Sequence, residues 1–315
     1  MREIGGYFGL EPLNGEEYYK DLIAVNNARN GLLYLLQARK IRKMYLPYFL
    51  CNSVSEVCDR GGSPYEYYNI GEDFLPVFEK KLEEGEYLYV VNYYGQLSNE
   101  TVVELKTRYT NIILDNVQAF FQRPCAGVDT LYSCRKFFGV PDGGYVSTNV
   151  ALSKDLPTDI SMDRMMHILG RFEGKRASDY YLDFQANESS FVGLELRLMS
   201  ELTHNLMKAI DYQAVRGKRE ENFAFLDSQL SSRNCLKPKR TVGPYAYPLY
   251  CDNGMEIKKR MAEKKIYIPT LWPEIVQSGQ TLETSFAENI LPLPCDQRYD
   301  IDDMDRIVRE LTGLM

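Results

Sequence analysis

Short apolar runs alternate with amphipathic segments through the first half of the chain. Runs rich in aromatic and branched residues at 65–70, 87–92 and 111–115 have the composition of buried strands. The segment NETVVELKTRY at 99–109 lies between the last two, and its apolar spacing predicts a helix. Such alternation predicts an α/β domain with a mainly parallel sheet. Ligands of these sheets bind beyond the carboxyl ends of the strands, and Asp115 lies at one such end.

The first sixty residues follow the same pattern. The runs LIAV at 22–25 and KMYLP at 43–47 are short and apolar, as expected for strands. Leucines in the segment 29–40 share one helical face, which predicts a helix directly after the first run. A second helix is predicted for LCNSVSEVCDR at 50–60, where the pair Gly61-Gly62 stops it.

The pattern changes after position 150. The polar stretch KRASDYYLDFQANESS at 175–190 predicts a loop, and the segment 191–230 predicts long helical material. The remainder, with PYAYPLYC, MEIKKRMAEKK, IYIP and DDMDRIVREL, predicts a second strand-helix-strand-helix unit. Because single cores stop growing near ~250–300 residues, we expect two lobes. The predicted domains are 1–216, an N-terminal arm with a large domain, and 217–315, a small C-terminal α/β domain.

Composition restricts the partners. The formal net charge of −7 and the pI near 5.2 give no attraction for nucleic acid or for an anionic membrane surface, so neither is expected as a partner. The start of the chain has no basic and apolar signal-peptide pattern, and no apolar run approaches the ~20 residues that span a bilayer. The seven cysteines form no CxxC pair, which disfavours a metal site and suits small core residues in a reducing cytosol. A cytoplasmic protein is predicted.

Candidate chemistry gathers after the strand at 111–115. The segment YSCRKFFGVPDGG at 132–144 places Ser133 and Lys136 shortly before the pair Gly143-Gly144. A lysine on a turn is most often simply solvated. Lysine amines also form Schiff bases with carbonyls, notably with pyridoxal phosphate, whose pyridine nitrogen needs an acidic partner. Asp115 would be that partner, Ser133 would bind the cofactor phosphate, and Lys136 would reach the aldehyde.

A second candidate anion site lies at NNARNG, residues 26–31. Here a strand leads into a helix whose first free amides, at Ala28 and Arg29, would bind a phosphate. The alternative is an ordinary asparagine N-cap with nothing bound, which the segment alone favours.

Taken together, the segments VNNAR, LPYFLCNSV, VNYYGQ, IILDNVQAFF and YSCRKFFGVPDGG resemble the DegT/DnrJ/StrS sugar aminotransferases, which are fold-type I pyridoxal-phosphate enzymes. The resemblance implies an aspartate aminotransferase-like α/β fold with pyridoxal 5'-phosphate as cofactor. It assigns Lys136 to the Schiff base, Asp115 to the pyridine nitrogen and Gln118 to the ring hydroxyl. It also assigns Ala28 and Arg29 to the phosphate.

The chain departs from the family pattern at several positions. The family's phosphate serine stands five residues before the lysine, where this chain has Leu131, so Ser133 at the three-residue spacing takes that role. Asn92 begins NYYG where the family has histidine-x-x-glycine, and we expect it at the cofactor. The ring that stacks on the cofactor aligns with Cys51, so Phe49 or Tyr48 is expected to substitute.

A further departure concerns the contact between subunits. The segment GLELRLMSEL at 193–202 resembles the one whose asparagine reaches the neighbouring subunit's cofactor phosphate, but Glu195 stands there. Either this contact is lost or another residue, such as Asn187, provides it. The family's active sites lie between subunits, so a homodimer is expected.

The resemblance implies transfer of an amino group from glutamate to a keto-sugar that is usually nucleotide-linked, in glycan or secondary-metabolite biosynthesis. Fold and cofactor do not determine the substrate, so two alternatives stay open. One is another pyridoxal-phosphate activity on an amino acid or small ketone. The other is a protein that keeps the fold without turnover. Arg29 and Arg135 are further candidates for an anionic group, although surface arginines are common.

Overall fold

A computed structural model describes residues 4–277, 279 and 281–315. Its largest element is an eight-stranded sheet with the strand order β1-β8-β7-β6-β5-β2-β3-β4. The five strands from β7 to β3 run parallel, whereas β1, β8 and β4 pair antiparallel with their neighbours. The strands are β1 (Ile23–Val25), β2 (Lys43–Pro47), β3 (Tyr65–Ile70), β4 (Pro76–Val77), β5 (Glu86–Val91), β6 (Ile112–Asp115), β7 (Asp129–Ser133) and β8 (Gly144–Ser147). The mainly parallel α/β sheet predicted from the sequence is confirmed.

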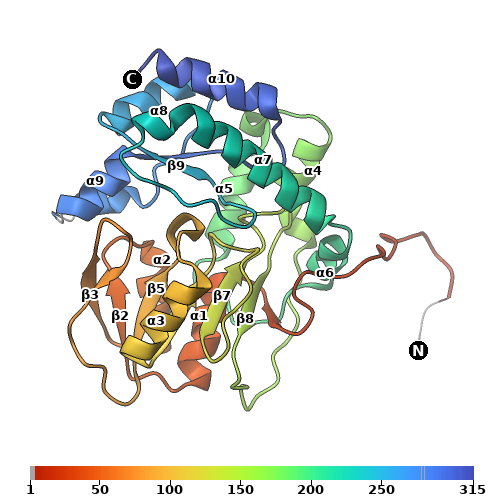
Figure 1. Ribbon diagram of the computed structural model, residues 1–315. Helices are drawn as coiled ribbons and strands as arrows, with labels where there is room; N and C mark the ends of the chain where they lie inside the picture. The colour runs from red at the N-terminus through yellow and green to blue at the C-terminus, as the bar shows by residue number, and fades with distance from the viewer. Residues whose placement is uncertain (1–3, 278, 280) are drawn as a thin grey trace.

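Three helices connect the strands of this sheet and pack on it: α1 (Ala28–Ala38), α2 (Asn52–Gly61) and α3 (Asn99–Tyr109) (Figure 1). Helix α1 begins where the side chain of Asn27 accepts a hydrogen bond from the amide of Asn30, and its leucines are buried. Helix α2 ends at Gly62 in the left-handed conformation. These starts and stops follow the capping residues that the sequence places there.

The segment between the two domains differs from its prediction. The polar stretch 175–190, predicted as a loop, forms a short 3-10 turn and helix α5 (Tyr181–Ser190), which packs against α4 (Met166–Phe172). The segment 191–230, predicted as helical throughout, begins as an extended stretch that pairs with the sheet through a bridge between Leu198 and Val25. Only then do α6 (Glu201–Lys208) and α7 (Tyr212–Leu230) follow.

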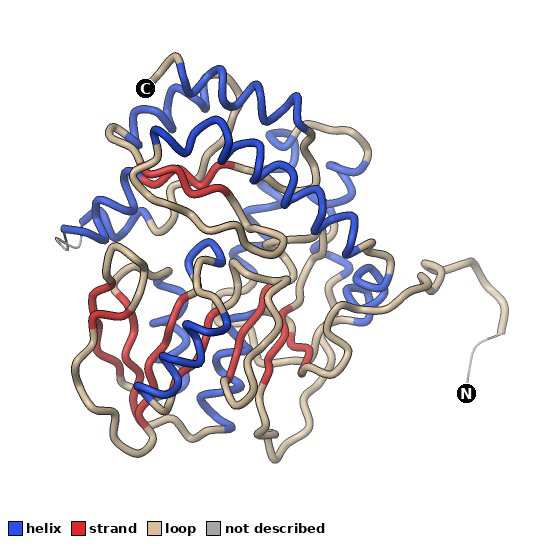
Figure 2. The backbone as a smooth tube through the Cα atoms, viewed as in Figure 1, coloured by secondary structure: helices blue, strands red, loops and turns tan. Residues whose placement is uncertain are grey.

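The C-terminal domain lies beyond one end of the sheet, as Figures 1 and 2 show. Its two antiparallel strands, β9 (Tyr247–Tyr250) and β10 (Ile290–Leu293), pack with helices α7, α8 (Gly254–Glu263), α9 (Thr281–Asn289) and α10 (Ile301–Thr312). The IYIP segment, predicted as the second strand, is irregular, and ILPL of β10 takes that place. The predicted domain boundary at 216/217 falls within α7, whose later residues join the core of this domain.

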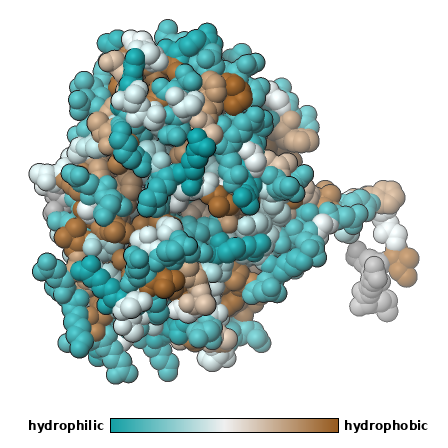
Figure 3. Space-filling model, viewed as in Figure 1, coloured by the Kyte–Doolittle hydropathy of each residue, from teal (hydrophilic) through white to brown (hydrophobic). Residues whose placement is uncertain are grey.

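The N-terminal segment projects from the body as an extended arm (Figures 1 and 3). Its apolar side chains Ile4, Tyr7 and Phe8 are almost fully exposed. The arm joins the body where Asn205 of α6 binds the amide of Leu13 and the carbonyl of Glu11. In the part of the chain that the structure describes, no helix has both the length and the apolar character needed to cross a membrane.

Candidate active site

The register of the sheet brings the predicted site residues to one edge. Asp115 pairs with Leu131 at the carboxyl ends of β6 and β7, and Ser133 extends two residues further along β7. Ser133 pairs with Gly144 of β8, and Gly144 pairs with Val25 of β1, directly before the turn into α1. Asp115, Ser133 and the start of α1 are therefore neighbours, although about ninety residues of sequence separate the first of them from the last.

Asp115 is a buried carboxylate, with 5% of its surface exposed. One carboxylate oxygen accepts a hydrogen bond from the hydroxyl of Tyr89 at 2.8 Å, and the other accepts one from the amide of Val117 at 2.9 Å. Burial raises the pKa of Asp115, and it outweighs these two bonds and the nearby charge of Lys136. No described lysine or arginine forms an ion pair with Asp115. A protonated ring nitrogen would supply the missing positive charge.

Gln118 carries an unused hydrogen-bond donor. Its side-chain oxygen accepts the amide of Tyr94 at 2.8 Å, so the side-chain nitrogen points elsewhere. That nitrogen is buried and has no partner within the described residues. A buried amide nitrogen without an acceptor is costly, and an oxygen of a bound ligand would satisfy it. The geometry therefore fits the contact to a ring hydroxyl predicted for Gln118.

The start of α1 offers free amides beside a narrow backbone cradle. Asn27 accepts the amides of Asn30 and Gly31, which leaves those of Ala28 and Arg29 for a ligand. A Cβ atom on Gly144 would lie 2.9 Å from the nitrogen of Ala28, so only glycine leaves this space open. The side-chain nitrogen of Asn27 is buried and has no hydrogen-bond partner in the described part of the chain. These donors fit a phosphate group.

Lys136 is the exposed residue of a tight turn after β7. The amides of Phe137 and Phe138 bind the carbonyl of Cys134 at 3.0 and 2.9 Å, and both phenylalanine rings are buried. The amine lies 5.6 Å from the ring centroid of Tyr245. Within the described residues it makes neither a hydrogen bond nor an ion pair. The turn therefore fixes the backbone of Lys136 while the amine stays available.

Two of the predicted cofactor residues are used by the protein itself. The side-chain nitrogen of Asn92 binds oxygens of Asn116 and Gln122 at 3.0 and 2.7 Å, and its oxygen accepts the amide of Leu97. Phe49 is fully buried, and its ring meets that of Trp272 edge-on at 4.6 Å. Both side chains therefore make internal contacts beside the site, and their contact with the cofactor stays a prediction.

The other candidates near position 50 also lack the geometry of a stacking ring. Tyr48 stacks on Tyr67 at 5.0 Å, within the sheet surface. Cys51 begins α2, where its sulfur accepts a hydrogen bond from Ser53 at 3.1 Å. The charge of a Cys51 thiolate would be a minor contribution to the raised pKa of Tyr89, after burial and Asp115.

Glu195 turns its side chain to solvent, where it pairs with Arg197 at 3.1 Å and is 77% exposed. Its backbone carbonyl instead accepts hydrogen bonds from the side chains of Asn26 and Asn30 beside the start of α1. Asn187 is buried on α5, where it donates to the carbonyl of Pro141 and keeps an unpartnered oxygen. Its carboxamide therefore contacts the segment before Gly143.

Positive charge gathers beside this edge, including a residue that the sequence did not suggest. Arg60, at the end of α2, binds the side-chain oxygen of Asn30 at 2.6 Å. Burial and the neighbouring charge of Arg29 lower the pKa of Arg60. Arg135 is paired with Glu188, whereas Arg29 and Arg60 have no carboxylate partner among the described residues. The excess positive charge suits an anion at the start of α1.

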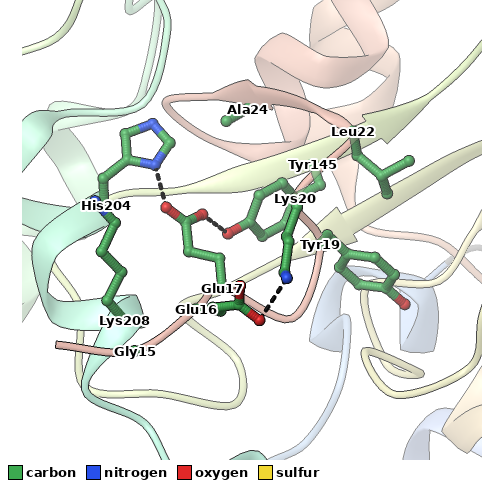
Figure 4. Close-up of a pocket in the computed structure, with 10 residues that line it drawn as sticks. All are labelled: Gly15, Glu16, Glu17, Tyr19, Lys20, Leu22, Ala24, Tyr145, His204 and Lys208. Atoms are coloured by element: carbon green, nitrogen blue, oxygen red, sulfur yellow. Dashed lines mark hydrogen bonds and ion pairs between the residues drawn. The ribbon is translucent and has the colours of Figure 1, made fainter.

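Metal chemistry finds no ligand set here. Among the described residues, no three histidine, cysteine or acidic side chains are grouped so that they could hold a metal ion. A cavity of about 280 Å³ lies elsewhere, between the N-terminal arm, β8 and α6 (Figure 4). Its polar lining includes Glu17, which reaches both His204 and Tyr145.

No known family model matches the sequence, and no curated protein sequence matches it. Solved structures do. A DegT DnrJ EryC1 StrS aminotransferase from Brucella abortus superposes with a TM-score of 0.63 at 16% identity, covering 93% of this chain and 85% of that one. DesV from S. venezuelae gives 0.65 at 16% identity, with 93% and 84% covered. The PLP-form of the sugar aminotransferase Spr1654 from Streptococcus pneumoniae gives 0.61 at 14% identity, with 91% and 85% covered.

At these identities the likeness establishes the fold. The chain is similar over nearly its whole length to aminotransferases of the kind that its motifs suggested. The predicted fold, a large sheet domain with a smaller C-terminal domain, is therefore confirmed.

Proposed function

We propose that the chain is a pyridoxal-phosphate-dependent aminotransferase. The observation that supports this most directly is a set of unused polar groups around one edge of the sheet. These are the amine of Lys136, the carboxylate of Asp115 without a cation, and the side-chain nitrogen of Gln118 without an acceptor. Each group is complementary to a different part of the same cofactor.

Each residue would bind a different part of the cofactor. Asp115 would pair with the pyridine nitrogen, Gln118 would donate to the ring hydroxyl, and the amides of Ala28 and Arg29 with Ser133 would bind the phosphate. Bound pyridoxal phosphate supplies an electron sink that stabilises negative charge on a substrate carbon. Lys136 would bind the cofactor covalently when no substrate is present.

In its unbonded form the amine of Lys136 would move a proton to and from the substrate carbon. Its turn suits this role, because buried Phe137 and Phe138 fix the backbone while the side chain remains exposed. Asp115 would hold its carboxylate close to the ring nitrogen, and the hydrogen bond from Tyr89 orients that carboxylate.

For the substrates we propose glutamate as the amino donor and a keto-sugar, either free or nucleotide-linked, as the acceptor. The motif resemblance supports this choice, and so does the similarity to proteins described as sugar aminotransferases, such as CalS13 from Micromonospora echinospora. Activity on an amino acid or small ketone is the competing proposal. The positive charge of Arg29 and Arg60 beside the start of α1 favours an acceptor or donor that carries an anionic group.

We further propose a homodimer, in the cytoplasm. Apolar side chains are exposed on and beside α4 and α5, next to the Arg135–Glu188 pair at the site: Ile160, Met162, Phe172, Leu182 and Val192. A patch of this kind marks an interaction surface. The seven cysteines are all unpaired thiols, which suits a reducing compartment. Sedimentation of the wild type and of Leu182→Glu tests the dimer. We expect the wild type to sediment as a dimer and the variant as a monomer.

The decisive experiment for the activity uses the purified protein with pyridoxal phosphate. We expect a new absorption band, a borohydride-stable label that maps to Lys136, and loss of the band when glutamate is added. Lys136→Met should abolish the label, whereas Lys154→Met, at another exposed lysine, should leave it intact. Label without a response to glutamate would indicate a non-catalytic protein. Keto-sugars and simple 2-keto acids tested as acceptors would then separate the two enzyme proposals.

A further inference from the structure

Arg219 of α7 is a buried cation without a carboxylate partner. Its side chain is only 2% exposed, and among the described residues it forms no ion pair. Burial lowers the pKa of Arg219. Nearby Asp296 forms no described ion pair with it and binds Arg298 with both carboxylate oxygens, at 2.7 and 2.9 Å, so its charge only partly offsets the burial of Arg219. A buried charge of this kind is expensive to desolvate, so other polar groups must compensate for the missing ion pair.

The guanidinium instead binds neutral oxygens from three separate loops. It donates to the carbonyl of Pro244 at 2.8 Å, to that of Phe137 at 3.3 Å and to the side-chain oxygen of Gln297 at 2.8 Å. Its carbon also lies 4.5 Å from the centroid of the Phe137 ring. One residue of the C-terminal domain thus binds both the backbone and the ring of the residue that follows Lys136.

Gln297 completes this arrangement. Its side-chain nitrogen donates to the same carbonyl of Phe137 at 2.7 Å, while its oxygen accepts from Arg219. The carbonyl that follows Lys136 therefore has two donors, and both come from the C-terminal domain. A carbonyl held by two side chains that also bind each other has little freedom to rotate.

The second loop that Arg219 binds also faces Lys136. The bond from Arg219 to Pro244 fixes the backbone next to Tyr245, and a longer contact of 3.5 Å joins Arg219 to the carbonyl of Tyr245 itself. The ring of Tyr245 lies 5.6 Å from the amine of Lys136. Arg219 therefore contacts both the turn that carries the amine and the loop that borders it.

We propose that Arg219 and Gln297 are positioning residues for Lys136, which orient its amine by holding the Phe137 carbonyl and the Tyr245 loop. Through them the C-terminal domain controls the reactivity of a lysine that belongs to the large domain. The proposal rests on the proposed function, because it concerns the attachment of pyridoxal phosphate to Lys136. Neither residue touches the groups assigned to the cofactor, so cofactor binding as such is independent of them.

The test separates orientation of the amine from affinity of the site. Pyridoxal phosphate at saturation reports covalent capture by Lys136, measured as the rate of borohydride-stable labelling. Pyridoxamine phosphate cannot attach to a lysine and reports affinity alone, measured by fluorescence titration. For Arg219→Met we expect labelling to slow by on the order of tenfold or more, because a small misplacement of a reacting group has a large effect on rate. The affinity for pyridoxamine phosphate should stay within about threefold of wild type, since the residues assigned to cofactor binding are retained.

Gln297→Ala removes one of the two donors to Phe137 without touching a buried charge, so it covers the case in which Arg219→Met does not fold. It should slow labelling to a smaller extent. Lys218→Met, on the solvent side of the same helix, is the matched control and should behave as wild type. Equal labelling rates in all four proteins would overturn the proposal, as would a parallel loss of pyridoxamine phosphate affinity. Absence of label on wild-type Lys136 would instead reject the proposed function itself.

Discussion

The hydroxyl of Tyr89 lies 2.8 Å from a carboxylate oxygen of Asp115 and donates a hydrogen bond to it. Both side chains are buried, on the neighbouring strands β5 and β6. Burial, with the Asp115 charge next, raises the pKa of Tyr89 well above its ordinary value, so this hydroxyl keeps its proton and acts as a donor. Tyr89 thus stabilises the charged form of the carboxylate on which the proposed ring contact depends.

Replacement of this tyrosine should weaken the carboxylate environment. We expect Tyr89→Phe to lower the free energy of unfolding by ~1.5–3 kcal/mol, the usual value of a hydrogen bond to a charged group. Urea denaturation at neutral pH measures the change. Tyr67→Phe is the control, because Tyr67 lies on the surface of β3 and its hydroxyl has no hydrogen bond to a described residue. Similar stabilities for both variants would show that the Tyr89 bond contributes nothing.

Asp115 should make the protein without cofactor less stable as the pH rises. Burial raises the pKa of Asp115 above its ordinary value of 3.8, so the folded state holds the proton more tightly than the unfolded state does. Stability from this group is present at low pH and is lost as the pH rises through the raised pKa. The free energy of unfolding of Asp115→Asn, relative to wild type, should therefore increase with pH above about 4.

Urea denaturation at several pH values measures this trend. With saturating pyridoxamine phosphate the wild type should be more stable than Asp115→Asn, because only the wild type offers a carboxylate to the ring nitrogen. A variant that keeps the wild-type affinity for pyridoxamine phosphate would argue against the assignment of Asp115.

Two glycines of the Lys136 segment should respond differently to alanine. A Cβ atom at Gly144 would lie 2.8 to 3.0 Å from backbone atoms of Tyr132, Ala28 and Asn27, so the start of α1 would have to move. Gly144→Ala should lower stability by ~1–3 kcal/mol, as overpacked sites do, and should weaken pyridoxamine phosphate binding. At Gly139 the nearest atom lies at 3.6 Å. Gly139→Ala should leave both thermal unfolding and the titration unchanged.

The junction of the N-terminal arm should depend on pH in both directions. Glu17 lies 2.6 Å from a ring nitrogen of His204 and accepts a hydrogen bond from Tyr145 (Figure 4). The bond to Glu17 raises the pKa of His204, with Glu201 and Asp142 adding negative charge nearby. Although burial opposes it, the bonds to His204 and Tyr145 lower the pKa of Glu17, and Lys208 adds to this effect.

The contribution of the pair is therefore largest at intermediate pH. It is lost as the pH falls below 4.5 through the lowered pKa of Glu17, and again as the pH rises above 6.5 through the raised pKa of His204. His204→Gln should remove the loss at high pH and lower stability by ~1 kcal/mol near pH 6. Thermal unfolding from pH 4 to 9 measures both effects, and parallel profiles for the two proteins would contradict the assignment.

Local pattern was sufficient for the elements of the large domain and failed where burial was not periodic. The run at 111–115 and the helix at 99–109 have their expected bounds within about two residues, because the helix packs one face on the core and the strand is buried throughout. Helix α5 was missed because its residues are mostly polar, so no apolar face marks it. The IYIP run at 266–269 buries Ile266 and Ile268 as a strand would, yet its backbone joins neither sheet.

The sequence by itself determined the α/β alternation and the order of chemical groups along the chain, including Asp115 at a strand end and Lys136 before a glycine pair. Period and composition carry this information, since both are properties of neighbouring residues. Only the tertiary structure decided which groups meet. Phe49 and Asn92 form contacts within the protein, Tyr89 came to bind Asp115, and Arg219 came to hold the turn that carries Lys136. Arg219 binds a carbonyl 82 residues away, and no local pattern encodes a contact that chain folding alone brings together.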